Sequence, residues 1–358
     1  MHIGAPKTGT TYLQERLAVN AAELARHGVL VPTGNPLVSP TLFHFRAALD
    51  LLQRTWGKPG HSDGAWNTFV RKAKRSRGTV ILSHEILAPA KAQHVEKLKA
   101  DLDVGRSTEL HIVYSARDLA RQLPAAWQES LKQGGRRNFG GFLDLQQARR
   151  GWFVKAFDLP QVLNTWSAGL PPEQVHLVTV PRRGEVPREE LWLRFCRVFG
   201  IDPAWAPTDT PHANVSLDIA EARVLRRLNR QLPREVREGP SYDHLIRILL
   251  AEGRLSQRTS GKIEVPPALM PWVEEETMRW IEWVEAAGID VVGDLGDLRP
   301  RPSTSARWLD PDAPYPRREL SAAIDALALM TEVAAERIDP SQRLVEKVKR
   351  NTRKVLSR

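Results

Sequence analysis

Cysteine is almost absent from this sequence of 358 residues. Cys196 is its one cysteine, which excludes an internal disulfide framework and any zinc or iron–sulfur site built from several cysteines. Long apolar runs are also lacking, because no stretch approaches the roughly 18 uninterrupted apolar residues that a transmembrane helix needs. No charged leader followed by an apolar segment opens the sequence, so we expect no secretory signal. These features favour a cytoplasmic protein.

Negative charge is scarce relative to positive charge. Lysine and arginine number 52 against 42 aspartate and glutamate residues, a net charge of +10. Residues 340–358 alone hold seven basic residues and one acidic residue, so this tail carries +6 and the rest of the chain +4. A basic surplus favours anionic partners. The tail suits either a surface helix that contacts an anionic inner membrane surface or a disordered, solubilising segment.

The order of apolar segments predicts an α/β fold, with a parallel β-sheet flanked by helices and a mainly helical C-terminal part. Short, continuously apolar segments alternate with amphipathic stretches, as in parallel sheets that are covered on both faces. The expected strands are residues 2–3, 29–31, 79–82, 110–114 and 175–180. We expect one domain over residues 1–298, with its sheet core in about 1–200 and its helical part in about 201–298. A proline-rich linker over 299–316 and a helical segment with the basic tail over 317–358 follow.

The first informative motif is the loop of residues 4–11, which follows a short strand and opens a helix. Glycines let consecutive N–H groups turn inward, and the helix N-terminus adds partial positive charge. This combination, with hydroxyl groups and one mobile ammonium group, suits a phosphate-like dianion. It is not a standard Walker A sequence, because Thr10 stands where that motif has lysine and Lys7 precedes Gly9. Only three residues precede the loop, so we expect the natural chain to start upstream of Met1.

Residues 6–14 resemble the 5′-phosphosulfate loop of sulfotransferases that use 3′-phosphoadenosine 5′-phosphosulfate (PAPS), and most resemble the bacterial branch of that family. The resemblance implies a P-loop-like α/β fold over about residues 1–300. It implies that Lys7 contacts the oxygen that bridges phosphate and sulfate. The residues expected to hold the donor's 5′-end are Pro6, Lys7, Thr8, Gly9, Thr10 and Thr11.

A second motif offers a base for the acceptor. Sulfuryl transfer requires the acceptor hydroxyl or amine to lose a proton as it attacks. An apolar strand ends in Ser83-His84-Glu85, and ligands of parallel sheets bind at the carboxyl ends of strands. Sulfotransferases resemble this arrangement, with either His or Glu as base. If the strand continued, His84 and Glu85 would point apart, so one of them would be aimed at the acceptor. We favour Glu85, with His84 as the alternative base or an orienting partner.

A third motif delivers Arg117 to the end of the apolar strand near residues 110–114. The guanidinium fork suits a terminal phosphate. In sulfotransferases the 3′-phosphate motif looks like this Arg with a Ser eight residues later, but here that position is Ala125. Arg121, one helical turn after Arg117, could share the phosphate instead.

The expected function is therefore a PAPS-dependent sulfotransferase, with Lys7 and either Glu85 or His84 as catalytic residues, PAPS as co-substrate and no metal. Two other functions stay open: a nucleotide-triphosphate-dependent kinase on a modified phosphate loop, and a non-enzymatic basic protein that binds a nucleotide or a membrane. The acceptor is not readable from the sequence and could be a small molecule, a carbohydrate, a glycolipid or a protein. No nucleic-acid-binding module is recognisable.

Overall fold

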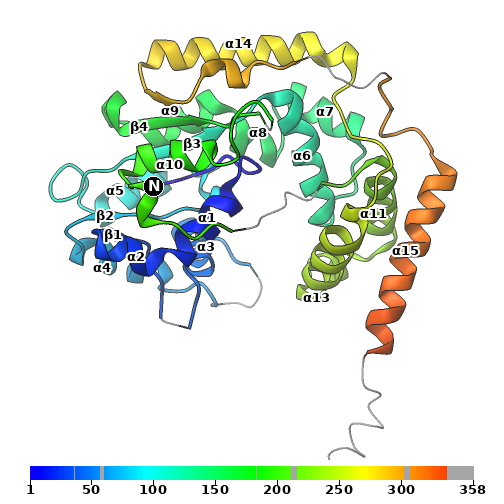
Figure 1. The fold of residues 1–358 in the computed structure, drawn as a ribbon, viewed down its shortest axis with the longest axis horizontal. Coiled ribbons are helices and arrows are strands. Elements are labelled where there is room, and N and C mark those ends of the chain that lie inside the picture. The colour runs from blue at the N-terminus through cyan, green and yellow to red at the C-terminus, as the bar shows by residue number, and fades with distance from the viewer. Residues whose placement is uncertain (36, 57–59, 183, 211–215, 302–306, 337–358) are drawn as a thin grey trace, which may run out of the picture. The chain divides into compact units, whose positions relative to one another are not determined.

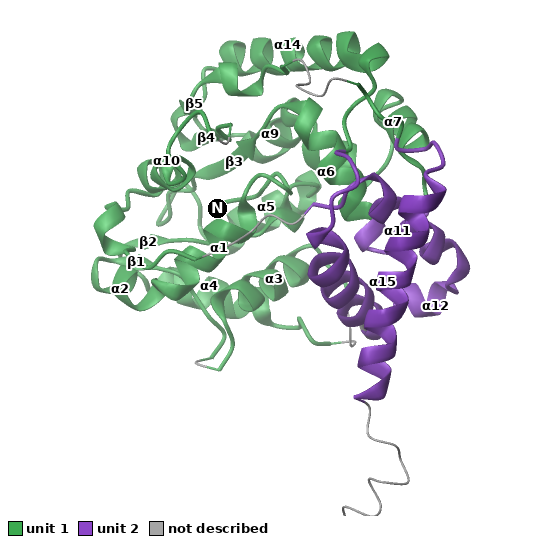
Figure 2. Cartoon of the chain, turned by 45° about the vertical axis from the view of Figure 1, so that its right-hand side comes forward, with its two compact units in different colours: residues 1–130, 137–214, 263–310 green, residues 131–136, 215–262, 311–358 purple. Residues whose placement is uncertain are grey.

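The computed structural model describes residues 1–35, 37–56, 60–182, 184–210, 216–301 and 307–336. Their contacts divide the chain into two units (Figure 2). Unit 1 comprises residues 1–130, 137–214 and 263–310, and unit 2 comprises residues 131–136, 215–262 and 311–358. No helix in the described ranges is long and apolar enough to cross a lipid bilayer.

Unit 1 is an α/β structure whose strands are all parallel (Figure 1). One small sheet pairs β1 with β2, and the other has the order β3-β4-β5. The bounds of the strands are β1 Val29–Leu30, β2 Thr79–Val80, β3 Ile112–Ala116, β4 Val175–Thr179 and β5 Asp290–Val292. β3 and β4 are buried along their whole length, which explains their continuously apolar sequences. Four of the five expected strands are thus confirmed in position, each within a few residues, whereas residues 2–3 form only parallel bridges.

The N-terminal segment joins the two small sheets. His2 forms parallel bridges to Ser83, just beyond β2, and to Val113 in β3. Its backbone N–H donates to the carbonyl of Leu82, and the N–H of Ile3 donates to the carbonyl of Val113. The segment therefore occupies the centre of a continuous parallel arrangement, and the loop that follows it emerges at the carboxyl edge of the strands.

Helices cover both faces of these strands. On one face, α1 and α10 contribute to an apolar core with β3, β4 and β5. Trp192 and Phe195 of α10 are completely buried in this core. On the other face α9 contacts β3, and α5 and α14 contact α9. The helices of unit 1 are α1 Thr10–Val19, α2 Ala21–Arg26, α3 Pro40–Leu51, α4 Ala65–Arg75, α5 Ala92–Asp101, α7 Phe139–Gln147, α8 Trp152–Phe157, α9 Leu159–Ser167, α10 Glu190–Phe199 and α14 Met270–Ala287, with most of α6 Leu119–Lys132.

Unit 2 is helical. It contains α11 Ile219–Gln231, α12 Arg234–Arg237, α13 Pro240–Tyr242, a π-helix over Asp243–Arg254 and α15 Pro316–Ala335. Two buried carboxylates tie it together. Glu319 of α15 accepts from Arg223 of α11 at 2.7 Å, and Glu221 of α11 accepts from Arg258 at 2.9 Å.

The two units follow boundaries other than those expected from the sequence. β5 belongs to the sheet, although its residues fall within the part expected to be helical. The sequence pattern indicates β5 only weakly, because the strand has three residues and directly follows an 18-residue helix. No separate apolar run distinguishes the strand from that helix. Helix α15 agrees with the helix expected beyond the linker. The basic tail, residues 340–358, lies outside the described residues, as do residues 302–306 of the linker.

We expect the stability of unit 1 to decrease as the pH falls from about 6.5 toward 3. Burial lowers the pKa of both His2 and His44 to about 3, so the folded protein excludes protons that the unfolded chain binds. Each histidine should contribute a slope of up to about 1.4 kcal/mol per pH unit in this window, with full stability above it. Denaturant unfolding of the His2→Asn/His44→Asn variant across this window should give a flatter dependence on pH. His27→Asn, a change at the exposed residue directly after α2, is the control, and an unchanged slope in the double variant would contradict the assignment.

Candidate active site

The loop of residues 4–9 connects the central N-terminal segment to α1. Its backbone has φ of 120° at Gly4, 64° at Lys7 and 92° at Gly9. Gly9 is the N-cap residue of α1, and no described side chain caps this helix. The N–H groups of the first turn of α1 therefore keep their capacity to bind an acceptor from outside the helix, and the helix dipole favours an anion there.

Polar side chains from neighbouring elements fix the shape of this loop. The Nε2 atom of Gln122, on α6, donates to the carbonyl oxygen of Pro6 at 2.6 Å. The buried hydroxyl of Thr8 donates to the carbonyl oxygen of Ala5 at 2.6 Å and lies 2.5 Å from the hydroxyl of Ser115 in β3. The hydroxyl of Thr8 is thus engaged within the loop rather than turned outward.

The ammonium group of Lys7 is ion-paired. Its Nζ lies 2.5 Å from Oε2 of Glu129 on α6, and the Lys7 side chain remains 36% exposed. Arg117, directly after β3, donates from Nη1 to the carbonyl oxygen of Lys7 at 3.1 Å. Arg117 therefore lies beside the backbone of Lys7. Thr10 is buried at the start of α1, and Thr11 is exposed beside it.

His84 and Glu85 lie together rather than pointing apart. The strand ends before them, because Glu85 begins a short 3-10 helix (Glu85–Leu87) that His84 caps with Nδ1. The Nδ1 atom of His84 and the Oε2 atom of Glu85 are 3.8 Å apart. Glu85 also accepts from Nε2 of Gln14 at 3.0 Å, while the His84 ring stacks on Phe45 with centroids 4.9 Å apart.

The protonation states of these two groups follow from their surroundings. Burial acts to raise the pKa of Glu85, but the charge of His84, the hydrogen bond from Gln14 and the charge of Lys7 outweigh it and lower that pKa below its usual value. Burial lowers the pKa of His84, against the opposing effect of Glu85. Near pH 7 the site therefore presents a carboxylate at Glu85 and a neutral imidazole at His84.

Arginines collect at the carboxyl edge of β3 and β4. Arg117 follows β3, while Arg121 and Arg182 both contact Asp118. Asp118 is buried and accepts from the backbone N–H of Arg121 at 3.0 Å, so it fixes the start of α6. Arg121 is thereby held by Asp118 and directed toward the carbonyl of Val180. Both arginines therefore have partners in the protein, Asp118 for Arg121 and the carbonyl oxygen of Lys7 for Arg117.

Three side chains that contact the predicted residues were not themselves predicted to be site residues. Gln14 positions Glu85, Gln122 holds Pro6, and Glu129 pairs with Lys7. Gln122 and Glu129 are seven residues apart on α6, so the helix period places them on one face. That spacing becomes informative only once the position of α6 beside the loop is known.

A cavity of about 550 Å³ lies elsewhere in unit 1, beside the amino ends of β3 and β4. It is lined by residues 104–110 and 169–171 together with Lys99 and Gln174, none of which the sequence analysis named as a candidate site residue. Among the described residues, no group of three or more His, Cys, Asp or Glu side chains is placed to hold a metal ion.

No protein-family model, curated protein or solved structure matches this chain. The functional argument therefore depends on the chemistry of the site.

Gly9→Ala should destabilise the protein more than the same substitution at a glycine of positive φ that has open space around it. A Cβ at Gly9 would lie 2.7 Å from Cδ2 of Leu191, and φ is +92°. Gly64 is a matched control, because it is the left-handed N-cap residue of α4 and a Cβ there meets nothing within 4 Å. We expect Gly64→Ala to cost about 1 kcal/mol and Gly9→Ala about 2–4 kcal/mol in denaturant unfolding. Adding Leu191→Ala to Gly9→Ala should remove the contact, and equal costs for the two single variants would contradict this account.

Proposed function

We propose that the protein is a sulfotransferase, which moves a sulfuryl group from PAPS to a hydroxyl or amine group of an acceptor. The observation that supports this most directly is the convergence of Lys7, Glu85 and Arg117 around one glycine-containing loop at the carboxyl edge of parallel strands. Arg117 contacts the backbone of Lys7, and the charge of Lys7 lowers the pKa of Glu85. Three groups that the reaction needs are thus close together. They are a cation to stabilise the leaving group, a carboxylate to accept a proton and a guanidinium to bind a second phosphate.

In this proposal the donor's 5′-phosphosulfate rests on the loop. The N–H groups at the start of α1 and the hydroxyl of Thr11 face the anion, and Lys7 moves from Glu129 to the oxygen that bridges phosphorus and sulfur. The 3′-phosphate is bound by Arg117, whose planar fork matches phosphate oxygens. Arg121, held by Asp118, contributes positive potential rather than a direct contact.

The transfer step conserves atoms and charge. The acceptor oxygen or nitrogen forms a bond to sulfur as the bond between sulfur and the bridging oxygen breaks, and adenosine 3′,5′-bisphosphate leaves. The acceptor's proton passes to the carboxylate of Glu85, which Gln14 orients. Lys7 stabilises the negative charge that develops on the departing phosphate. Catalysis in this scheme comes from positioning and from preorganised charge.

Glu85 is the better placed of the two candidate bases. Its carboxylate accepts a hydrogen bond from Gln14, which lies on α1 just after the loop. The backbone of Glu85 packs against Gly4. The Nδ1 atom of His84 already accepts from the backbone N–H of Ile86 at 3.2 Å. That nitrogen of His84 is therefore engaged in capping the 3-10 helix.

Lys7→Ala should lower the turnover number by about 10²-fold or more, in line with the loss of one preorganised charge at the transition state. The measurement is release of adenosine 3′,5′-bisphosphate from PAPS in the presence of a panel of hydroxyl and amine acceptors. Lys97→Ala is the matched control, because Lys97 also pairs with a carboxylate, that of Asp101 at 2.6 Å, but on α5. Turnover retained in a folded Lys7→Ala protein would refute the proposed role.

Arg117→Ala should remove the preference for a 3′-phosphate. We expect adenosine 3′,5′-bisphosphate to raise the melting temperature of the unaltered protein more than adenosine 5′-monophosphate does, because a ligand that binds the folded state stabilises it. The two nucleotides should become equivalent in Arg117→Ala, whereas Arg121→Ala should keep a clear difference. A rise in melting temperature with ATP and magnesium but not with the bisphosphate would instead favour a kinase.

A further inference from the structure

Helix α15 of unit 2, labelled in Figure 2, exposes large apolar side chains along one face. Leu320, Ile324 and Leu327 are 63%, 58% and 68% exposed. Residues separated by four and by three positions lie on the same face of an α-helix. Single exposed apolar residues are common on protein surfaces, whereas several large ones that adjoin each other indicate a contact surface.

This face stays uncharged over most of the helix. From Leu320 to Ala335, all of which the structure describes, the same helical spacing adds the exposed residues Ala328, Thr331 and Ala335 to the face. At 3.6 residues a turn, the uncharged face extends over about four turns. The outer face of a helix that only meets water normally carries charged residues, so α15 departs from this pattern.

The acidic residues of α15 lie away from the apolar face and pair with arginines of the same unit. Glu319 is buried and pairs with α11. Asp325 contacts Arg258, and Glu332 lies 3.1 Å from Arg254. Helical spacing places these three carboxylates about a third of a turn from the centre of the face. The negative charges of α15 are thus neutralised within unit 2, and none of them lies among the exposed leucines.

The chain that follows α15 is strongly basic. Residues 340–358 hold seven lysine and arginine residues against one glutamate, which gives this tail a charge of +6. The tail lies outside the described residues, so only its charge and its point of attachment enter the argument. It begins five residues after Ala335, the last residue of α15. An apolar face and a large positive charge are therefore joined closely enough to meet one partner.

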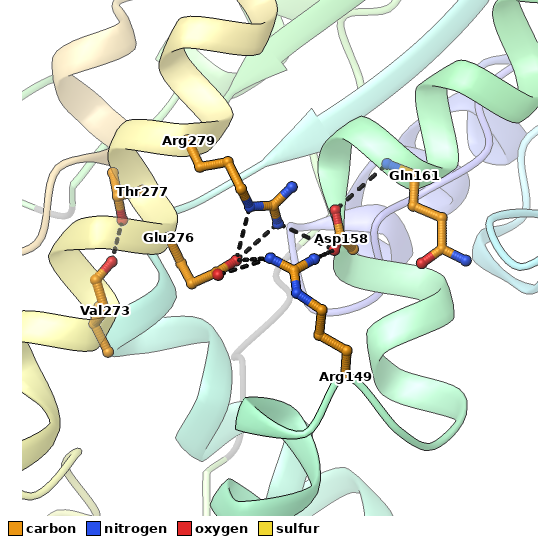
Figure 3. Close-up of polar contacts among 7 residues, drawn as sticks. All are labelled: Arg149, Asp158, Gln161, Val273, Glu276, Thr277 and Arg279. Carbon is orange, nitrogen blue, oxygen red and sulfur yellow. Dashed lines mark hydrogen bonds and ion pairs between the residues drawn. The ribbon is translucent and has the colours of Figure 1, made fainter.

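Most of the net positive charge of the chain is in this tail. The other 339 residues carry only +4, because many of their arginines are matched by carboxylates. In unit 1, for example, Arg149 and Arg279 each contact both Asp158 and Glu276, at 2.7 to 3.0 Å (Figure 3). Two cations and two anions leave that cluster without net charge. An anionic surface is therefore attracted chiefly to the tail and to what adjoins it.

We propose that the apolar face of α15 and the basic tail together bind the surface of an anionic lipid bilayer. The helix would lie in the plane of the membrane, with Leu320, Ile324 and Leu327 at the boundary between headgroups and acyl chains. The tail would be attracted to the negative headgroups. Stable attachment to a bilayer generally takes two such signals, one apolar and one electrostatic.

A bilayer fits both features better than the other partners that either feature suggests. A nucleic acid would attract the tail but would gain nothing from the exposed leucines. A second copy of the chain would cover the leucines but would bring another tail of the same charge. The inference goes beyond the proposed function and does not depend on it, and vesicle binding is measured without any sulfuryl donor.

The first test is co-sedimentation of the full chain with vesicles of phosphatidylcholine or of an equimolar mixture of phosphatidylcholine and phosphatidylglycerol. We expect binding to the anionic vesicles to be about a hundredfold tighter or more, because each basic residue near the surface adds to the attraction. Added sodium chloride should weaken this binding by screening. Equal binding to the two kinds of vesicle would overturn the proposal.

The second test separates the apolar face from the tail. Leu320→Gln/Leu327→Gln keeps every charge and should weaken binding to the anionic vesicles by about tenfold or more, because two side chains no longer enter the apolar boundary. Leu37→Gln/Leu193→Gln is the matched control, because it changes two exposed leucines of unit 1. It should leave binding unchanged, and equal losses in the two double variants would contradict the role of α15.

The third test locates the contact directly. Cys196 is buried, and burial raises the pKa of its thiol to about 12, so a cysteine introduced at the surface can be labelled selectively. A polarity-sensitive fluorophore on Ile324→Cys should shift its emission to shorter wavelength when anionic vesicles are added, whereas the same label on Leu193→Cys should not. No shift at residue 324 would overturn the proposal.

Light scattering without lipid tests the second copy as the partner. We expect the unaltered chain to have the same mass as Leu320→Gln/Leu327→Gln. A dimer that this double variant converts to a monomer would show that another copy covers the face, and would overturn the proposal.

Discussion

The candidate site depends on the hydrogen bonds that place the N-terminal segment between β3 and the residues that follow β2. The N–H of Ala5 donates to the carbonyl of Ser115, and Ser115 donates in turn to the carbonyl of Gly4, from its backbone N–H at 2.6 Å and from its hydroxyl at 3.0 Å. These bonds fix the backbone immediately before the loop. Without them, the start of α1 and Lys7 would have no defined position relative to Glu85 and Arg117, because those residues follow other strands.

The ion pair between Lys7 and Glu129 affects which anions this site can bind. Because Lys7 already has a carboxylate partner, a ligand gains only the difference between its own attraction for the ammonium group and that of Glu129. A dianion is a stronger partner than a carboxylate, whereas a monoanion is not. The pair therefore favours doubly charged groups, which agrees with the proposed phosphosulfate donor.

Much of the fold was predictable because its signals are local. β3 and β4 are continuously apolar, and the glycines at residues 4 and 9 mark a loop whose backbone takes positive φ. The candidate site residues could be named from sequence motifs, but their contacts could not. Glu129 pairs with Lys7 across 122 residues of chain, and no sequence pattern in either segment indicates this contact. The orientation of Glu85 was likewise unpredictable, because it depends on where the strand stops and the 3-10 helix begins.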